Sequence, residues 1–428
     1  MQSNKIVYTA MCLDHLHHGH LNIINECKKH GKVIIGLMTD EAVASYKRVP
    51  SLSYEKRKII AESLKDIHMI LPQETLDYRP NLRKLKPDFV VNGDDWRTGI
   101  QKETRQQVID VLEEWGGKLI EVPYTKGISS TVIIEDFRKN GVTPEQRMNM
   151  LRRLINVKPI VRVMEAHSGL SAKIVEDINH NGKQFDAIWE SSFTDSASKG
   201  KPDIELVDFT SRVQTINEIL EVTTKPIIVD GDTGGQREHF EFIVRTLERL
   251  GVSAIIIEDK KFPKINSLMP NAKHERETIK KFCEKIRAGK DAQITDDFMI
   301  FARIESFIAG DGLDDALKRA KAYIEAGTDG IMIHSKEQSA SEVIQFATEY
   351  NKFKKRVPLI IVPTTYCTFT EKEMKIFGVN VVIYANHLIR SSYQAMKDVA
   401  EDILIMECCN VKQKCCDVKE LFKLMERT

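Results

Sequence analysis

Acidic side chains follow two apolar runs of the sequence, at the point where each run ends. Asp230 and Asp232 come after Ile227–Val229, and Glu258 comes after Ala254–Ile257. Short β-branched runs are typical of buried strands, and the carboxyl ends of parallel strands meet at one edge of a sheet or barrel. Three carboxylates gathered there repel one another unless a cation lies among them, and oxygen ligands favour Mg²⁺ or Mn²⁺ over Zn²⁺. The sequence therefore predicts a magnesium site formed by Asp230, Asp232 and Glu258.

Two basic side chains end further runs of the same kind. Arg303 follows Met299–Ala302 and His334 follows Ile331–Ile333. Both side chains suit a phosphoryl group. Asp203 lies in a loop from which it can face the reacting centre. The segment after another apolar run offers an aromatic wall and backbone N–H groups for a substrate carboxylate, and its members are Trp189, Ser191, Ser192 and Phe193.

A charged loop begins at Glu258. The stretch 258–267 reads Glu-Asp-Lys-Lys-Phe-Pro-Lys-Ile-Asn-Ser. Its charges and its proline are typical of a polar loop rather than of the interior of an element. A mobile basic loop beside an acidic strand end is a common way for α/β enzymes to build a site for a metal and an anion.

Two histidines share a short motif near the start of the chain. His17 and His20 flank Gly19 at a predicted strand-to-helix turn. The start of a helix attracts phosphate, and imidazoles there can donate hydrogen bonds to a pentacoordinate phosphorus. The alternative is that the histidines bind a metal or only cap the helix. A second phosphate-binding candidate at the start of another helix favours the first interpretation: Ser129, Ser130 and Thr131.

Strands and helices alternate along the whole sequence. In the first third, strands are predicted over 5–10, 32–38, 88–92 and 118–123, which indicates a small Rossmann-like parallel α/β sheet. Eight further apolar runs follow residue 159, namely 160–165, 187–189, 227–229, 254–257, 299–302, 331–333, 359–362 and 381–384. Eight such units in about 270 residues fit a (β/α)₈ barrel, whose strand ends share one rim. An open doubly wound sheet is the alternative.

The composition fits a soluble enzyme with two domains. The chain has 428 residues, a size at which one core usually splits, and we place the domains at 1–142 and 143–428. A net charge of +1 argues against a nucleic-acid or membrane surface. The first residues lack the pattern of a signal peptide, so a cytoplasmic location is expected.

The first domain resembles the cytidylyltransferase family that acts on glycerol 3-phosphate and ethanolamine phosphate. The resemblance covers about residues 1–140 and rests on Asp14, His17, Gly19, His20, Lys47, Arg57, Gly93-Asp94-Asp95-Trp96 and Ile128-Ser129-Ser130-Thr131. It implies that His17 and His20 stabilise the transferring phosphate of CTP and that Lys47 contacts phosphates. Asp94 and Trp96 would help to hold the nucleotide, and the other nucleotide contacts that the resemblance implies are Asp14, Arg57, Ile128, Ser129, Ser130 and Thr131. Tyr124 stands where the family has an arginine, so one guanidinium group that could bind phosphate through two hydrogen bonds is missing.

The second domain resembles the isocitrate lyase/phosphoenolpyruvate mutase superfamily over about residues 150–428. The resemblance rests on the 258–267 decapeptide and on segments 166–172, 189–198, 230–232, 302–303 and 333–336. It implies that Asp230, Asp232 and Glu258 hold Mg²⁺. The phosphoryl group would contact Asn266, Arg303 and His334, and the substrate would also contact Ser267. Lys264 would close over the site in a lid that is open or disordered without substrate.

These resemblances imply a bifunctional enzyme of phosphonate biosynthesis, similar to fusions of the fosfomycin-pathway type. The barrel would interconvert phosphoenolpyruvate and phosphonopyruvate, forming a C–P bond. The first domain would transfer CMP from CTP to a phosphonate such as 2-hydroxyethylphosphonate or 2-aminoethylphosphonate. The alternatives are a phosphonopyruvate hydrolase, or a mutase with a degenerate CTP-sensing module. The superfamily also implies a homo-oligomer, a dimer or a tetramer, with a swapped terminal helix.

Overall fold

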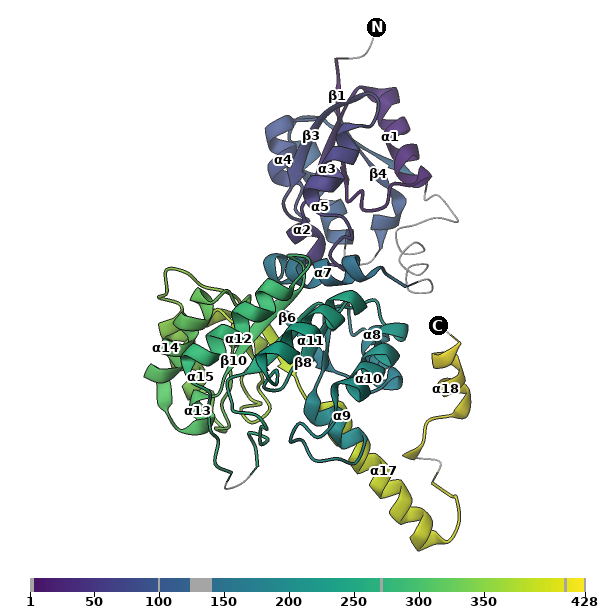
Figure 1. Cartoon of the computed structure of the whole chain (residues 1–428). Coiled ribbons are helices and arrows are strands. Elements are labelled where there is room, and N and C mark those ends of the chain that lie inside the picture. The colour runs from purple at the N-terminus through teal and green to yellow at the C-terminus, as the bar shows by residue number, and fades with distance from the viewer. Residues whose placement is uncertain (1–3, 99–100, 124–140, 270–271, 412–413, 427–428) are drawn as a thin grey trace. The chain divides into compact units, whose positions relative to one another are not determined.

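The computed structural model describes residues 4–98, 101–123, 141–269, 272–411 and 414–426 (Figure 1). The chain forms two compact units, residues 1–137 and 138–428. Within the described ranges, no helix is both long enough and apolar enough to cross a membrane.

The first unit is built on a parallel sheet with the strand order β3-β2-β1-β4-β5. The strands are β1 (Ile6–Met11), β2 (Lys32–Met38), β3 (Ile67–Gln73), β4 (Phe89–Gly93) and β5 (Lys118–Val122). The four predicted strands are confirmed, whereas β3 was not predicted. Its sequence lacks a clear alternation and contains Pro72, which an edge strand tolerates because its outer N–H groups need no partner.

Both faces of this sheet are covered. Alternate residues of β1 pack in opposite clusters, Val7 and Met11 in one and Tyr8 and Ala10 in the other. The helices of the unit are α1 (His18–His30), α2 (Asp40–Ala44), α3 (Tyr54–Glu62), α4 (Arg79–Leu85), the 3₁₀ helix η1 (Asp94–Arg97) and α5 (Lys102–Glu113). Burial on both faces is what a parallel sheet requires.

The second unit contains a closed parallel barrel with the strand order β10-β11-β12-β13-β6-β7-β8-β9. The strands are β6 (Val161–Glu165), β7 (Ala187–Glu190), β8 (Ile227–Asp230), β9 (Ala254–Glu258), β10 (Met299–Ile304), β11 (Gly330–Ile333), β12 (Leu359–Ile361) and β13 (Val381–Tyr384). The last strand pairs with the first, so the predicted barrel is confirmed and the open-sheet alternative is wrong.

Helices follow or flank the barrel strands. They are α7 (Pro144–Val157), α8 (Gly169–Asp177), α9 (Ser192–Ser198), α10 (Phe209–Val222), α11 (Arg237–Leu250), α12 (Ile279–Ala292), α13 (Ser306–Ala309), α14 (Gly312–Glu325), α15 (Ser341–Tyr350), α16 (Glu371–Ile376), α17 (His387–Met406) and α18 (Val418–Met425). Thr143 caps α7 through a reciprocal capping box with Gln146.

The alternation of side chains along each strand decides which residues reach the barrel interior. Ile255 and Ile257 of β9 belong to the core shared with the surrounding helices, so Glu258 points the opposite way. On β10, Ala302 and Ile304 belong to the same core, so Arg303 also points inward. Because side chains alternate between the two faces of a strand, Glu258 and Arg303 lie side by side at the rim.

Candidate active sites

The carboxyl ends of the barrel strands bring together several predicted site residues. Asp230 ends β8, Glu258 ends β9, and Arg303 pairs in register with Glu258. Arg303 Nη2 lies 3.2 Å from Glu258 Oε2. Asp230 accepts hydrogen bonds from Ser192 Oγ at 2.9 Å and from the backbone N–H of Asp232 at 3.2 Å. The metal-ligand candidates and one phosphoryl-binding candidate therefore occupy one rim.

The turn after β8 holds Asp232 in an unusual backbone conformation. Asp232 has φ = 52°, which is rare for a residue with a side chain. Gly231 before it packs so tightly that a Cβ atom would lie 2.7 Å from the Ile255 side chain and 2.9 Å from the Ile256 carbonyl oxygen. This close approach requires glycine. The turn therefore fixes where the Asp232 carboxylate points.

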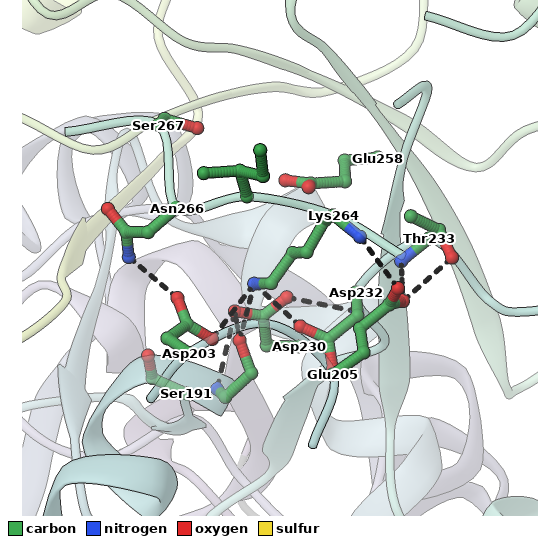
Figure 2. Close-up of polar contacts among 12 residues, drawn as sticks. Ser191, Asp203, Glu205, Asp230, Asp232, Thr233, Glu258, Lys264, Asn266 and Ser267 are labelled. Carbon is green, nitrogen blue, oxygen red and sulfur yellow. Dashed lines mark hydrogen bonds and ion pairs between the residues drawn. The ribbon is translucent and has the colours of Figure 1, made fainter. Parts of the chain in front are cut away.

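The ammonium group of Lys264 lies among these carboxylates (Figure 2). Its Nζ atom is 2.6 Å from Asp232 Oδ1, 3.2 Å from Asp203 Oδ1 and 2.8 Å from Ser192 Oγ, and the side chain is only 4% exposed. Burial alone would lower the pKa of Lys264. The surrounding carboxylates, Asp232 and Asp230 foremost, instead raise that pKa well above its ordinary value. Lys264 therefore supplies the positive charge at the centre of the rim.

The lid is folded across the rim rather than open. Asn266 Nδ2 donates to Asp203 Oδ2 at 2.6 Å, and the backbone N–H of Lys264 donates to Glu205 Oε2 at 2.9 Å (Figure 2). The two ends of the loop are joined where Glu277 N donates to the Asp259 carbonyl at 2.9 Å. The structure therefore describes the closed form of the lid, which the attraction of the lid's own lysine to the acidic rim stabilises. An open or disordered lid without substrate stays a prediction.

A second cluster of buried polar groups surrounds Glu305. Arg303 Nη2 lies 3.1 Å from Ser267 Oγ and 2.9 Å from His334 Nδ1. Glu305 accepts from Ser267 Oγ at 2.9 Å, lies 2.8 Å from His334 Nδ1, and is also bonded to Arg303 Nε. Lys260 Nζ donates to Ser267 Oγ at 2.5 Å. Three of the predicted phosphoryl and substrate contacts, Ser267, Arg303 and His334, are thus neighbours.

The charges in this cluster are set by burial and by pairing. Burial would raise the pKa of Glu305, but Arg303 and Lys260 hold it well below its ordinary value. Burial and the positive charge of Arg303 lower the pKa of His334, although Glu305 acts in the opposite direction. The cluster therefore presents a permanent cation and a neutral imidazole, which can both donate hydrogen bonds to an anion.

The carboxylate-binding candidates lie at the start of α9. Ser191 precedes this helix, and both Ser191 and Ser192 are buried, whereas Phe193 is half-buried. Ser192 is not among the described residues with positive φ, so a side chain is tolerated there. Trp189 is 2% exposed and lies in the barrel wall, where it packs rather than facing solvent.

The oxygen donors at the rim suit a hard divalent cation. Several buried carboxylate oxygens accept no hydrogen bond and are held by ion pairs with lysine or arginine, namely Asp203 Oδ1, Asp232 Oδ1 and both oxygens of Glu258. As the side chains stand, no three His, Cys, Asp or Glu residues in the described ranges converge as a metal site. Lys264 accounts for this arrangement, because the carboxylates face its ammonium group. The residues fit Mg²⁺ in donor type and charge once that ammonium group moves.

In the first unit, His17 and His20 form the start of α1. The backbone N–H of Gly19 donates to His17 Nδ1 at 3.1 Å, and that of His17 donates to His20 Nδ1 at 3.4 Å. The ring centroids are 3.9 Å apart. Burial lowers the pKa of His17, and burial with the nearby charges of His17 and Lys47 lowers that of His20 to about 3. Both rings are therefore neutral at pH 7 with the proton on Nε2. Both histidines therefore cap the start of α1, and the capping hydrogen bonds set the tautomer.

Other predicted nucleotide contacts hold this unit together. Arg57 is fully buried, and its guanidinium donates to Asp40 Oδ1 at 2.6 Å and to the Met38 carbonyl at 2.8 Å. Asp14 accepts from the backbone N–H of Leu52 at 2.8 Å, and Trp96 donates to Glu121 at 3.0 Å while 1% exposed. Arg57 and Trp96 therefore present almost no surface to a nucleotide.

The remaining candidates of the first unit lie in different surroundings. Lys47 is exposed and close enough to His20 to influence its charge. Asp94 begins η1 and is half-buried. The predicted residues Ile128, Ser129, Ser130 and Thr131, and also Tyr124, lie outside the described residues.

Sequence reasoning missed four charged residues around the rim, of which Lys260, Glu305 and Arg212 are buried and Glu205 is half-buried. Arg212 pairs with Glu190 and lies 3.1 Å from Asp232 Oδ2. Glu305 lies just after the end of β10, two residues beyond Arg303. An acidic residue at a strand end is the signal that identified Glu258, so the same signal could have found Glu305. Glu205 lies in an irregular loop, and its sequence surroundings carry no such signal.

Comparisons with known proteins agree with this architecture. A family model described as "Phosphoenolpyruvate phosphomutase" matches residues 151–404, and one described as "Cytidylyltransferase-like" matches residues 10–136. A phosphoenolpyruvate phosphomutase of Tetrahymena pyriformis is 40% identical over 288 residues, which cover 67% of this chain and 93% of that protein.

Solved structures share the barrel. That of a phosphoenolpyruvate phosphomutase from Streptomyces platensis subsp. rosaceus has a TM-score of 0.60 and 35% identity, covering 65% of this chain and 94% of the other. A phosphonopyruvate hydrolase in complex with oxalate and Mg²⁺ has a TM-score of 0.59 and 33% identity, covering 67% and 95%. This chain therefore belongs to the phosphoenolpyruvate phosphomutase family and carries a cytidylyltransferase-like domain in its first third.

Proposed function

We propose that the barrel interconverts phosphoenolpyruvate and phosphonopyruvate. The observation that carries this proposal is the lid: Lys264 and Asn266 reach from one loop across the rim, beside the cluster of Ser267, Arg303 and His334. Both substrates are phosphorylated three-carbon acids, so a site for them must bind a phosphoryl group and a carboxylate at once. The rim offers groups for both.

The reaction moves a phosphoryl group from the enol oxygen of phosphoenolpyruvate to its C3. A loose, metaphosphate-like species needs hydrogen-bond donors and positive charge around its oxygens, together with the exclusion of water. Arg303 and His334 supply donors from the strand ends, and Asn266 supplies one from the lid. Ser267 is held beside Arg303 and adds a hydroxyl. Asp203 lies against both Lys264 and Asn266, which supports a position for its carboxylate near the transferring phosphorus.

The substrate carboxylate would bind at the start of α9, through the backbone of Ser191, Ser192 and Phe193. Mg²⁺ would be held by Asp230, with Asp232 and Glu258 beside it. A bound Mg²⁺ would offset the charge of the carboxylates and polarise substrate oxygens. The buried oxygens of Asp232 and Glu258 that accept no hydrogen bond and face only cationic side chains support this assignment.

The choice between mutase and hydrolase depends on water. A hydrolase must admit water to the phosphorus, whereas the Lys264 side chain beneath this lid is 4% exposed. Incubation with phosphonopyruvate and Mg²⁺, followed by ³¹P NMR, tests the proposal. Phosphoenolpyruvate is expected as the product, and inorganic phosphate as the main product would instead identify a phosphonopyruvate hydrolase.

We propose for the first unit the transfer of CMP from CTP to a phosphonate such as 2-hydroxyethylphosphonate or 2-aminoethylphosphonate. The supporting observation is the pair of neutral histidines whose Nδ1 atoms accept backbone hydrogen bonds, which leaves Nε2–H as the donor for phosphate oxygens. Pyrophosphate release with CTP and each phosphonate tests the proposal. Saturable CTP binding without release for any acceptor would instead indicate a degenerate CTP-sensing module.

A further inference from the structure

Glu205 joins the lid to the fixed part of the rim. Its Oε1 atom accepts hydrogen bonds from the backbone N–H and the Oγ1 hydroxyl of Thr233, at 2.9 and 2.7 Å. Its Oε2 atom accepts from the backbone N–H of Lys264 at 2.9 Å. Figure 2 shows this carboxylate between Thr233 and the lid. One side chain therefore connects the turn after β8 to the loop after β9.

The Glu205 contact differs in kind from the other contacts of the lid. The side chains of Lys264 and Asn266 bind Asp203, Asp232 and Ser192, and the proposed function gives those groups to substrate and metal. Ligands must exchange those contacts for their own. The contact to Glu205 uses a backbone N–H group, so it can persist while the site is filled.

The lid has little apolar burial to hold it in place. Phe262 is 60% exposed, Leu268 is 46% exposed and Met269 is 51% exposed. Hydrophobic stabilisation scales with the apolar area removed from water, so these side chains contribute little to closure. Hydrogen bonds to a charged acceptor are stronger than hydrogen bonds between neutral groups, so they become the main attachment of the lid to the rim.

The backbone at Glu205 is also unusual. Its φ is 58°, in the left-handed region that side chains rarely adopt. A residue in this conformation persists only where the surrounding contacts determine it. The three hydrogen bonds to its carboxylate are such contacts, and they aim both oxygens at fixed donors.

We infer that Glu205 is a positioning residue that latches the lid, and that this latch sets how much of the phosphoryl group of phosphonopyruvate reaches the enol oxygen rather than water. The inference rests on the proposed function of the barrel and deepens it. In productive turnover of phosphonopyruvate the C3–P bond breaks and an O–P bond forms to the enol oxygen. When water enters, its oxygen bonds to phosphorus instead, one of its protons goes to C3, and pyruvate and phosphate leave.

Glu205→Gln is the sharpest test because it is isosteric. Thr233 offers two donors to one oxygen of the residue 205 side chain. In the variant the amide oxygen therefore stays beside Thr233, and the amide NH₂ group faces the backbone N–H of Lys264. The variant therefore loses the lid contact and keeps the tie to Thr233. Glu248→Gln is the matched control. Glu248 is buried, and like Glu205 it accepts two backbone N–H groups, from Ile294 and Thr295, but these precede β10 at the other end of the barrel.

The first measurement is limited trypsin digestion of the full chain, with cleavage after Lys261 and Lys264 followed by mass spectrometry. Lid cleavage is expected to be about tenfold faster in Glu205→Gln than in the wild type or in Glu248→Gln. Equal rates in Glu205→Gln and the wild type would overturn the latch. An equal increase in Glu248→Gln would also overturn it, because general destabilisation would then explain the effect.

The second measurement is ³¹P NMR of phosphonopyruvate turnover. The share of product found as inorganic phosphate is expected to rise at least threefold in Glu205→Gln. An unchanged share with faster lid cleavage would overturn the link between the latch and the partition. Failure of the wild type to form either product would overturn the proposed function instead, and the digestion would still decide whether Glu205 holds the lid.

Discussion

At the scale of single residues, Lys264 governs the charge of the rim. Its ammonium group lies 2.6 Å from Asp232 and within reach of three other carboxylates. A divalent cation bound to the same carboxylates would have to displace that ammonium group. The lid lysine and the metal are therefore competitors for one cluster of oxygens until substrate brings additional negative charge.

Replacing Lys264 with Met should tighten metal binding to the free protein. Two unit charges of the same sign about 4 Å apart repel each other by about 4 kcal/mol at an effective dielectric constant of about 20. Relief of about a third of that repulsion would tighten metal binding about tenfold. Titration with Mn²⁺, followed by electron paramagnetic resonance, measures the Kd. Lys261→Met is the control, because Lys261 is an exposed lysine of the same loop that pairs with Glu275. Equal Kd values in both variants would contradict the competition.

Replacing Asn266 with Ala should reduce turnover by about a hundredfold and change the unfolding free energy by less than about 1 kcal/mol. Asn266 is half-buried and bonded to Asp203 and to the backbone of Leu268, so few packing contacts are lost. Steady-state kinetics and urea unfolding of the same preparation provide the two numbers. A loss of stability large enough to account for the loss of turnover would make the loop structural.

His20 should make the protein sensitive to acid. Its folded pKa is about 3, below the value of about 6.5 for an unfolded histidine, so the unfolded chain binds more protons between these pH values. Stability therefore rises with pH across that window and falls on acidification, by at most about 2 kcal/mol between pH 7 and pH 5. Urea unfolding at both pH values is expected to show a smaller loss in His20→Gln than in the wild type. An equal loss would indicate that His20 titrates normally.

At the scale of elements, the barrel followed from the sequence because each strand is a short β-branched run ending in polar residues. Strand ends also identified Asp230, Glu258 and Arg303, since the alternation of side chains leaves these residues facing the interior. The edge strand β3 was missed because it is half-exposed and lacks such a run. Glu205 could not be identified, because its role arises only where a loop meets Thr233 and the lid.

Arg57 shows how a resemblance in sequence can leave a structural role unseen. The resemblance assigned it to the nucleotide, but its guanidinium connects the ends of β1 and β2 to the loop before α3. Its acceptors are Asp40 and the backbone carbonyls of Cys12, Met38 and Leu52. Which arginine becomes buried depends on how three loops meet, and the local sequence does not specify that.

Replacing Arg57 with Met should therefore destabilise the first unit by about 3–5 kcal/mol, because it removes the buried guanidinium that Asp40 and three backbone carbonyls bind. Arg83→Met is the control, since Arg83 and Glu114 form an exposed pair in the same unit that is worth about 1 kcal/mol or less. Chemical unfolding of both full-length variants measures the difference. If Arg57→Met has normal stability but a raised KM for CTP, Arg57 acts in nucleotide binding rather than in holding the fold.

At the scale of the whole molecule, the last two helices present a large apolar surface. Neither α17 nor α18 has a buried side chain among its described residues. The exposed apolar residues are Tyr393, Met396, Ile403, Leu404, Ile405, Met406, Val418, Leu421, Phe422 and Met425. Exposed apolar side chains in this number are typical of a binding interface, and we propose that a second copy of the chain covers them through an exchanged terminal helix.

The double substitution Leu404→Glu with Ile405→Glu should then dissociate the assembly. Both side chains are more than three-quarters exposed, so they contribute little to the fold of one copy, and two carboxylates in an apolar interface are strongly unfavourable. Light scattering after size exclusion is expected to give a dimer or tetramer for the wild type and a monomer for the variant. Ile376→Glu on α16 is the control, because Ile376 is similarly exposed but lies outside these helices. A monomeric wild type would show that the helices are covered by another molecule, and dissociation by Ile376→Glu as well would show that added charge alone disperses the assembly.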